Sequence, residues 1–283
     1  MADAWQTYAV IIPLVILGGL GYPVWHDLIT RRLSLQTKIA LLATAVLIVI
    51  GTLAIGRIEK PRNAQRWGRD VQYEDLAIKT DPGQMRNRDP YRRALDSLFL
   101  AVNARSGGFA TVDTANGKLS PGTRSVLIAL MTIGGAPASV AGGIKTVTFV
   151  VLLSAAAAAI RRRRTPAGTR PQAGASDGPR NRVVYHAAIV FFVYLAVLWF
   201  ITTALAVTHP QIGFLDLAFE AASACGCVGL STGVTPHLNL AGRLLLIVAF
   251  IFGRLAPLAL LFSMAAPRRP SRLEQTDEPL MTG

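Results

Sequence analysis

The chain has 283 residues, of which 52% are hydrophobic and only 16% are charged, and its formal net charge is +13. A soluble domain carries roughly 25% charged residues, and a disordered chain is poor in apolar ones, so this composition excludes disorder as the main state. The two cysteines, Cys225 and Cys227, are too close in sequence to staple a fold, which excludes a disulfide scaffold.

Five stretches are apolar and long enough, or nearly so, to cross a bilayer, which takes about 20 helical residues. In chain order they are residues 8–25, 38–56, 122–160, 183–207 and 238–266. The first stretch has neither a basic leading region nor a small-residue cleavage site, so it is not a signal peptide. The sequence therefore predicts an all-α integral membrane protein.

The third stretch, 122–160, is much longer than one straight span requires. Its middle contains four glycines and a proline, which predicts a broken helix (Gly134, Gly135, Pro137, Gly142, Gly143). Non-helical backbone at membrane depth is tolerated only where protein covers it or a water-filled cavity hydrates it. The predicted break therefore points to a cavity.

Basic residues gather at the ends of the spans, between the first two, between the third and fourth, and after the last (Arg31, Arg32, Lys38; Arg161 to Arg164, Arg170, Arg180, Arg182; Arg268, Arg269, Arg272). The positive-inside rule places these three regions in the cytoplasm, with 161–182 as a linker and 267–283 as a tail. The loop 57–93 would lie outside, although it carries ten Lys and Arg. Anionic lipid explains the arginine run 161–164 better than nucleic acid does.

The chain also contains one unit twice. Five residues after the second span match five after the fourth at an offset of 120 (Leu95/Leu215, Asp96/Asp216, Phe99/Phe219, Ala101/Ala221, Ala104/Ala224). Further matches follow in the same order, among them Gly108 with Gly229 and Gly134 with Gly253. We expect each unit to comprise an outer helix, a short re-entrant helix, an extended glycine segment and an inner helix.

The short amphipathic stretches 94–104 and 214–224 suit helices that cross half a membrane. Each is followed by an extended segment with a glycine at the corresponding position (Ser106, Gly107, Gly108, Phe109; Cys227, Val228, Gly229, Leu230). Backbone carbonyls turned toward an axis can replace the water shell of an alkali cation, and glycine permits the positive φ that this turning needs. The pattern predicts two ion-binding filter segments.

Other interpretations remain open from the sequence. The filter glycines could instead pack helices, since membrane helices favour small residues at contacts. Residues 142–146 are similar to a phosphate-binding loop, but the glycine and lysine are not adjacent. Cys225 and Cys227 have His209 and His237 in neighbouring loops, with a spacing unlike that of zinc sites. The spans contain no catalytic constellation, so we predict no enzyme.

These motifs resemble the Trk/Ktr/HKT superfamily of potassium transporters over nearly the whole chain. The resemblance is carried by residues 104–113, 133–137, 141–146, 228–233 and 253–257. It implies four outer-helix, pore-loop and inner-helix units around a potassium pore, of which this chain resembles the third (38–160) and the fourth (183–266). In the third, the loop is 57–93, the pore helix and filter 94–110, and the inner helix 122–160. Residues 1–30 resemble the inner helix of the second unit.

Two filters do not surround an ion, so the resemblance implies a truncated subunit or a pore completed by other chains. We expect a homodimer or a completing membrane subunit, membrane lipid and a cytosolic nucleotide-binding regulator as partners, no nucleic acid and no bound cofactor. Potassium would be the substrate, and the plasma membrane the location (the inner membrane in a Gram-negative bacterium). A non-conducting membrane scaffold is the alternative.

By the same resemblance, Gly134, Gly135, Gly142 and Gly143 would belong to an intramembrane gating loop, and Arg254 would face it. Physical reasoning agrees on Arg254, because a charge in an apolar helix costs roughly 2.5–3.5 kcal/mol on insertion scales and marks a functional candidate. Lys145 is predicted either to snorkel to the interface or to act as a ligand.

Overall fold

The computed structural model describes residues 5–59, 85, 89–115, 119–139, 141–164 and 177–265. Within these ranges every regular element is helical, and the sole strand-like feature is a parallel bridge between Ile133 and Ile144. The predicted all-α class is therefore confirmed for the described part of the chain. The tail 267–283 and most of the loop 57–93 lie outside the described residues.

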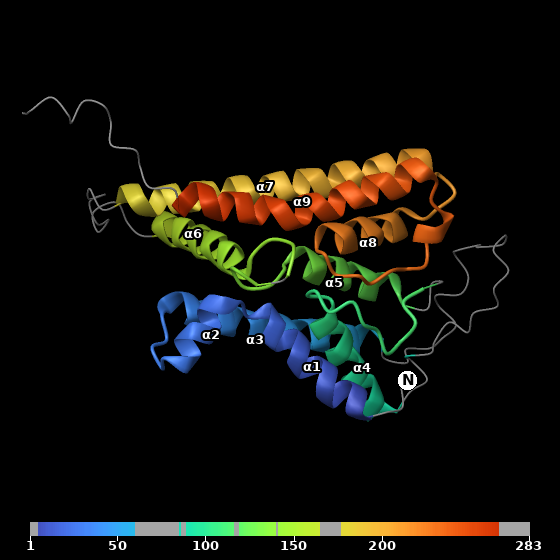
Figure 1. The fold of residues 1–283 in the computed structure, drawn as a ribbon, viewed down its shortest axis with the longest axis horizontal. Helices are drawn as coiled ribbons and strands as arrows, with labels where there is room; N and C mark the ends of the chain where they lie inside the picture. Colours follow the sequence, from blue (N-terminus) through green and yellow to red (C-terminus); the bar gives the residue numbers. More distant parts are fainter. Residues whose placement is uncertain are drawn as a thin grey trace, which may run out of the picture.

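The helices follow the chain in the order drawn in Figure 1: α1 (Trp5–Gly19), α2 (Tyr22–Ile29), α3 (Leu35–Ile58), α4 (Pro90–Asn103), α5 (Pro121–Thr132), α6 (Thr146–Arg164), α7 (Asp177–Thr208), α8 (Phe214–Cys225), the short 3₁₀ helix η2 (Thr235–His237), and α9 (Leu240–Ala265). Helices α7, α8 and α9 lie together on one side, and α1 to α4 lie on the other, with α5 between them (Figure 1). Helix α7 already begins at Asp177, inside the predicted linker 161–182.

Three segments match the length and composition of membrane spans. Helix α3 and residues Val183–Thr208 of α7 are each long and apolar enough alone, and α1 and α2 pass the test together. Their outward faces carry large apolar side chains, such as Leu42 and Phe192, each 67% exposed. Exposed apolar surface of this extent is expected where a helix faces lipid.

The inner helix that the sequence places over 1–30 is two helices, α1 and α2, bent by 98°. The backbone turns at Gly21, where φ is 77°, and Pro23 then starts α2. A Cβ at Gly21 would overlap the carbonyl oxygen of Pro137, and the Ala136 amide donates to the Gly19 carbonyl over 2.9 Å. The bend thus fits α1 and α2 against residues between α5 and α6.

Residues 133–145, which we call the break, separate α5 from α6. The Gly134 amide donates to the Ile144 carbonyl over 2.9 Å, and the Ile144 amide donates to the Thr132 carbonyl over 3.0 Å. Gly143 adopts a φ of 74°. These crossing hydrogen bonds satisfy part of the backbone that the interrupted helix leaves without intrahelical partners.

Helices α5 and α9 begin in equivalent ways. Ser120 caps α5, and its amide donates to the Glu59 carboxylate at the end of α3 over 3.0 Å. Asn239 precedes α9, and its amide donates to Nε2 of His209 at the end of α7 over 3.0 Å. In both groups of helices, therefore, the end of the long helix, α3 or α7, anchors the start of α5 or α9.

The short helices α4 and α8 carry the centre of the packing. Phe99 and Phe219 occupy matching positions and are fully buried. Arg124 of α5 forms an ion pair with Asp216 in the first turn of α8, and both side chains are mostly buried. This pair joins the α3–α6 group to the α7–α9 group.

Candidate functional site

Helices α4 and α8 each end in an extended segment of four residues. We call residues 106–109 the first segment and residues 227–230 the second segment. The Gly107 amide donates to the Asn103 carbonyl over 2.9 Å, and the Val228 amide donates to the Ser223 carbonyl over 2.9 Å. Each segment thus leaves its helix through a tight turn that directs the negative end of the helix dipole toward it.

The two segments share one backbone pattern. Positive φ occurs at Ser106 (110°) and Gly108 (71°) in the first segment, and at Cys227 (52°) and Gly229 (93°) in the second. The residues between them lack positive φ, so consecutive residues alternate in sign. Positive φ at a non-glycine residue costs on the order of 1–3 kcal/mol and persists only where its surroundings enforce it. Such alternation turns successive carbonyls toward the same side.

The segments lie side by side. A Cβ added to Gly108 would be 2.7 Å from the carbonyl oxygen of Val228, and one added to Gly229 would be 3.4 Å from the Cα of Gly108. A side chain at Gly108 would therefore displace the second segment. Both glycines let the two backbones approach each other.

Polar side chains at matching positions lie behind the segments. The Ser223 hydroxyl accepts a hydrogen bond from the Gly229 amide over 3.2 Å. Asn103, the equivalent residue of α4, is fully buried and donates through Nδ2 to the Phe99 carbonyl over 2.9 Å. A Cβ at Gly107 would overlap its Oδ1, which finds no hydrogen-bond partner within the described residues.

Two buried carboxylates hold the chain where it leaves the segments. Asp96 of α4 accepts from the Thr111 hydroxyl over 2.6 Å. Glu220 of α8 accepts from the Thr232 amide over 2.8 Å and from the Thr235 hydroxyl over 2.8 Å. Thr111 and Thr232 match in the sequence repeat, so the buried acid of each short helix restrains the same position.

The break touches the second segment and is bonded to Arg105, the residue that precedes the first segment. A Cβ at Gly142 would lie 2.7 Å from both Sγ of Cys227 and the carbonyl oxygen of Gly226. The break's first glycine carbonyl, that of Gly134, accepts from Nη2 of Arg105 over 2.8 Å. Gly135 also lies within the break and is buried. The predicted glycines of the break and the predicted filter residues are therefore brought together.

Two further cations lie at the end of the break: Lys145 is its last residue, and Arg254 lies nearby on α9. Lys145 is nearly buried, and its Nζ donates to the Ala141 carbonyl over 2.6 Å, so it bonds the break instead of snorkelling. Arg254 is exposed on α9 and lies close enough to Lys145 for their charges to interact. The structure thus places Arg254 near the end of the break.

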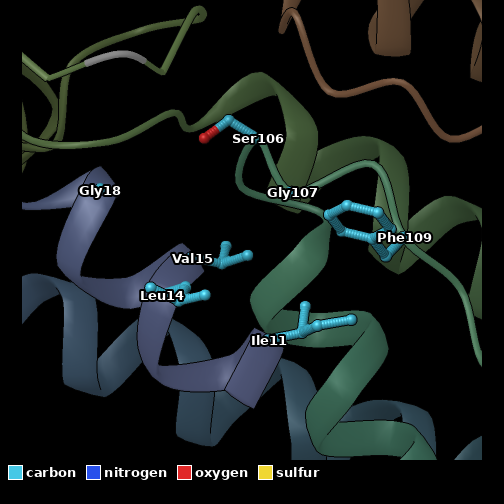
Figure 2. Close-up of a pocket in the computed structure, with 7 residues that line it drawn as sticks. All are labelled: Ile11, Leu14, Val15, Gly18, Ser106, Gly107 and Phe109. Carbon is cyan, nitrogen blue, oxygen red and sulfur yellow. The ribbon is translucent and has the colours of Figure 1, made fainter. Parts of the chain in front are cut away.

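Helix α1 flanks the first segment on another side. A cavity of about 330 Å³ separates them, and α1 contributes Ile11, Leu14, Val15 and Gly18 to its lining. Figure 2 shows these residues facing Ser106, Gly107 and the 55%-exposed Phe109. The second segment has α5 and the break as its corresponding neighbours, since α5 packs against α8 as α1 packs against α4.

Sequence reasoning missed several residues of this site. Arg105 is one of them: it follows the amphipathic helix α4 directly, and nothing in its local sequence indicates that its side chain is buried. The repeat pairs Asp96 with Asp216, but the sequence does not show that Asp96 lies buried in the middle of α4. Glu220 and Ser223 carry no sequence signal of their own, because their partners lie in a loop whose path the sequence does not reveal.

Comparison with known proteins identifies the family of the chain. The family model for the cation transport protein TrkH matches residues 74–271. The potassium/sodium uptake protein NtpJ of Enterococcus hirae is 30% identical over all of this chain and 59% of its own length. The Ktr system potassium uptake protein B of Bacillus subtilis is 31% identical over 97% of this chain and 56% of its own length.

A solved structure shows the same fold. The potassium transporter TrkH from Vibrio parahaemolyticus superposes with a TM-score of 0.65 at 17% identity, over 94% of this chain and 53% of its own. The chain thus spans between half and three fifths of these relatives. The family comprises transporters and not enzymes, in agreement with the sequence prediction. By its match over most of the sequence, the chain belongs to the TrkH family of cation transport proteins, among the membrane subunits of the Trk/Ktr superfamily.

Proposed function

We propose that the chain provides two walls of a transmembrane pathway for a monovalent cation, potassium above all. The observation that carries this proposal is the pair of adjoining segments with the same alternation of φ. The α3–α6 group, in which the break interrupts the last helix, and the α7–α9 group, in which α9 is continuous, present these segments in the same way. A packing role for the glycines would not require positive φ at Ser106 and Cys227.

In this proposal the carbonyl oxygens of eight residues replace water around the ion (Ser106, Gly107, Gly108, Phe109, Cys227, Val228, Gly229, Leu230). The C-terminal ends of α4 and α8 add negative potential at the same place. The thiol of Cys227 donates weakly to the Phe250 carbonyl over 3.7 Å. Coordination at that position would therefore fall to its backbone carbonyl.

The break is proposed to be the gate. It occupies the space beside the second segment, and Gly142 leaves no room for a side chain there. Its glycines, Gly134, Gly135, Gly142 and Gly143, let the backbone pack closely on itself and, at Gly142, against the second segment. Arg254 and Lys145 would place positive charge on the cation's path while the break is seated.

We propose the sequence-predicted units as the domain arrangement: residues 38–160 and 183–266 as pore-loop units, preceded by the helical segment 1–30. Because two segments cover only part of an ion's surroundings, a second copy of the chain or another membrane subunit would complete the pathway. The plasma membrane is the proposed location.

The relatives' names suggest the substrates and the partners. One relative takes up potassium and sodium, and another is the B component of a Ktr potassium uptake system. We propose potassium as the principal substrate, with a cytosolic regulatory subunit that binds nucleotide. The basic residues at the cytoplasmic span ends would contact anionic lipid.

Expression in cells that lack potassium uptake tests the proposal. The chain is expected to restore growth at limiting potassium, whereas Gly229→Ala, which strains a φ of 93°, is expected not to. Gly56→Ala is the matched control, because a Cβ there meets nothing closer than 3.5 Å. Failure of the wild-type chain to support growth, despite its presence in the membrane, would favour the non-conducting scaffold.

A further inference from the structure

Arg105 lies between the first segment and the break. It immediately precedes Ser106, and its side chain is only 7% exposed. Nη2 donates to the Gly134 carbonyl over 2.8 Å, and Nη1 donates to the Thr44 carbonyl of α3 over 3.4 Å. The guanidinium therefore connects three elements: the first segment, the break and the outer helix α3.

The break creates the acceptor that Arg105 uses. Helix α5 ends at Thr132, so the Gly134 carbonyl has no amide one turn further along the chain to pair with. A buried carbonyl without a partner is costly, and a charged donor satisfies it better than a neutral one. In the part of the chain that the structure describes, no backbone amide donates to the Gly134 carbonyl oxygen, and the guanidinium supplies the donor.

The cost of burying Arg105 argues that its position matters. Within the described residues no carboxylate pairs with it, and its Nε has no hydrogen-bond partner. A buried cation held by carbonyls alone is expensive compared with an apolar side chain of similar volume. Packing alone would be served more cheaply by leucine or methionine.

The repeat 183–266 shows what replaces Arg105 where the inner helix, α9, is continuous. Gly253 of α9 aligns with Gly134, and Cys225 of α8 aligns with Arg105. A Cβ at Gly253 would overlap the carbonyl oxygen of Cys225, so the short helix and the inner helix touch directly there. In the repeat 38–160, whose inner helix is broken, the Arg105 guanidinium lies at this contact between the short helix and the inner helix instead.

We propose that Arg105 is a positioning residue that couples the first segment to the break. This inference rests on the proposed function, in which the first segment binds the cation and the break is the gate. When the break lies beside the second segment, as in this structure, its Gly134 carbonyl binds the guanidinium and thereby restrains the backbone between Arg105 and Ser106. When the break moves away from the second segment, Arg105 loses this hydrogen-bond acceptor, and the first segment is no longer restrained.

Hydrogen exchange on the purified chain tests the coupling without requiring conduction. Arg105→Gln is expected to raise amide exchange about tenfold in both residues 106–109 and residues 134–144, while α7 stays protected. Arg105→Lys, which keeps a charged donor, is expected to restore part of the protection. Arg243→Gln is the matched control: Arg243 donates to the Leu238 and Pro236 carbonyls over 3.0 and 2.7 Å, away from the break.

A double-variant cycle separates coupling from mere stability. Gly143→Ala strains the break at a φ of 74° and should raise exchange in residues 106–109 when Arg105 is present. In the Arg105→Gln background, the added strain should leave these residues unchanged, because the connection is already lost. Additive effects of the two substitutions, or unchanged exchange in Arg105→Gln, would overturn the role of Arg105.

Flux measurements distinguish this inference from the proposed function. In vesicles, Arg105→Gln should lower the ratio of rubidium to sodium flux by about fivefold or more, with partial recovery in Arg105→Lys. Absence of flux through the wild-type chain contradicts the proposed function, and the exchange experiment still decides the coupling. An unchanged flux ratio in Arg105→Gln beside a conducting wild type contradicts the coupling alone.

Discussion

Gly108 and Gly229 lie against each other, although 121 residues separate them in the chain. A Cβ on Gly229 would come within 3.4 Å of the Cα of Gly108, and both residues have positive φ. This contact aligns two segments that emerge from separate helices, α4 and α8. The proposed cation pathway depends on it, because carbonyls from both segments must face the same ion.

The two glycines should respond differently to substitution. Gly108→Ala combines positive φ with a Cβ 2.7 Å from the Val228 carbonyl oxygen, whereas Gly229→Ala meets only an ordinary contact. Each φ costs on the order of 1–3 kcal/mol for alanine, and Gly108→Ala must also move the second segment. Thermal unfolding in detergent should therefore show the larger loss of stability for Gly108→Ala. Equal losses would contradict the close approach of the segments.

Arg124 and Asp216 should stabilise the contact between the two groups of helices. Their side chains are 8% and 16% exposed, so Arg124→Ala leaves a carboxylate mostly buried without its partner. We expect a loss of about 3 kcal/mol in the free energy of unfolding. Replacing both residues by leucine should cost less than the single change, because no uncompensated charge remains. A double variant less stable than Arg124→Ala would contradict this account.

Glu220→Gln should loosen the chain beyond the second segment. The carboxylate accepts from the Ser231 hydroxyl over 2.7 Å, as well as from Thr232 and Thr235. The amide of glutamine keeps one acceptor oxygen but turns the other position into a donor that faces a hydroxyl. We expect about 1–3 kcal/mol less stability and faster exchange at the Thr232 amide. Asp89→Asn, at the exposed start of α4, is the control and should change neither quantity.

His209 should be replaceable by a neutral acceptor. Its Nε2 accepts the Asn239 amide, while Nδ1 lies 3.3 Å from the Leu205 carbonyl, which assigns the ring proton to Nδ1. His209→Leu leaves the Asn239 amide without its acceptor and should cost about 1–3 kcal/mol in unfolding. His209→Gln should cost less, since its carbonyl can accept. Equal costs for the two variants would show that the amide does not depend on this side chain.

Arg254→Ala should raise cation flux. The proposal places the positive charges of Arg254 and Lys145 near the break, where they oppose an entering cation. Flux of rubidium into vesicles measures the effect, with protein content matched between preparations. Arg243→Ala removes a charge from the other end of α9 and serves as the control. Unchanged or lower flux through a well-expressed Arg254→Ala chain would contradict this role.

The sequence was sufficient to predict the helical class and the family, because apolar stretches and paired glycine motifs are local signals. The bend at Gly21 was not predicted, since its cause is the approach of Pro137 from a distant part of the chain. The buried arginine at position 105 escaped notice for a similar reason. Its side chain is bonded to the Gly134 carbonyl, and this partner lies far from Arg105 along the chain. Long-range partners, and not local propensity, decide these features.

The flux ratio of rubidium to sodium in Gly229→Ala tests the central claim most directly. Vesicles from cells expressing the wild-type chain, Gly229→Ala or the control Gly56→Ala would be compared at equal protein content. The account predicts rubidium-selective flux in the wild type and in Gly56→Ala, and a loss of selectivity in Gly229→Ala. Selective flux that persists unchanged in Gly229→Ala would contradict the assignment of residues 227–230 to the cation pathway.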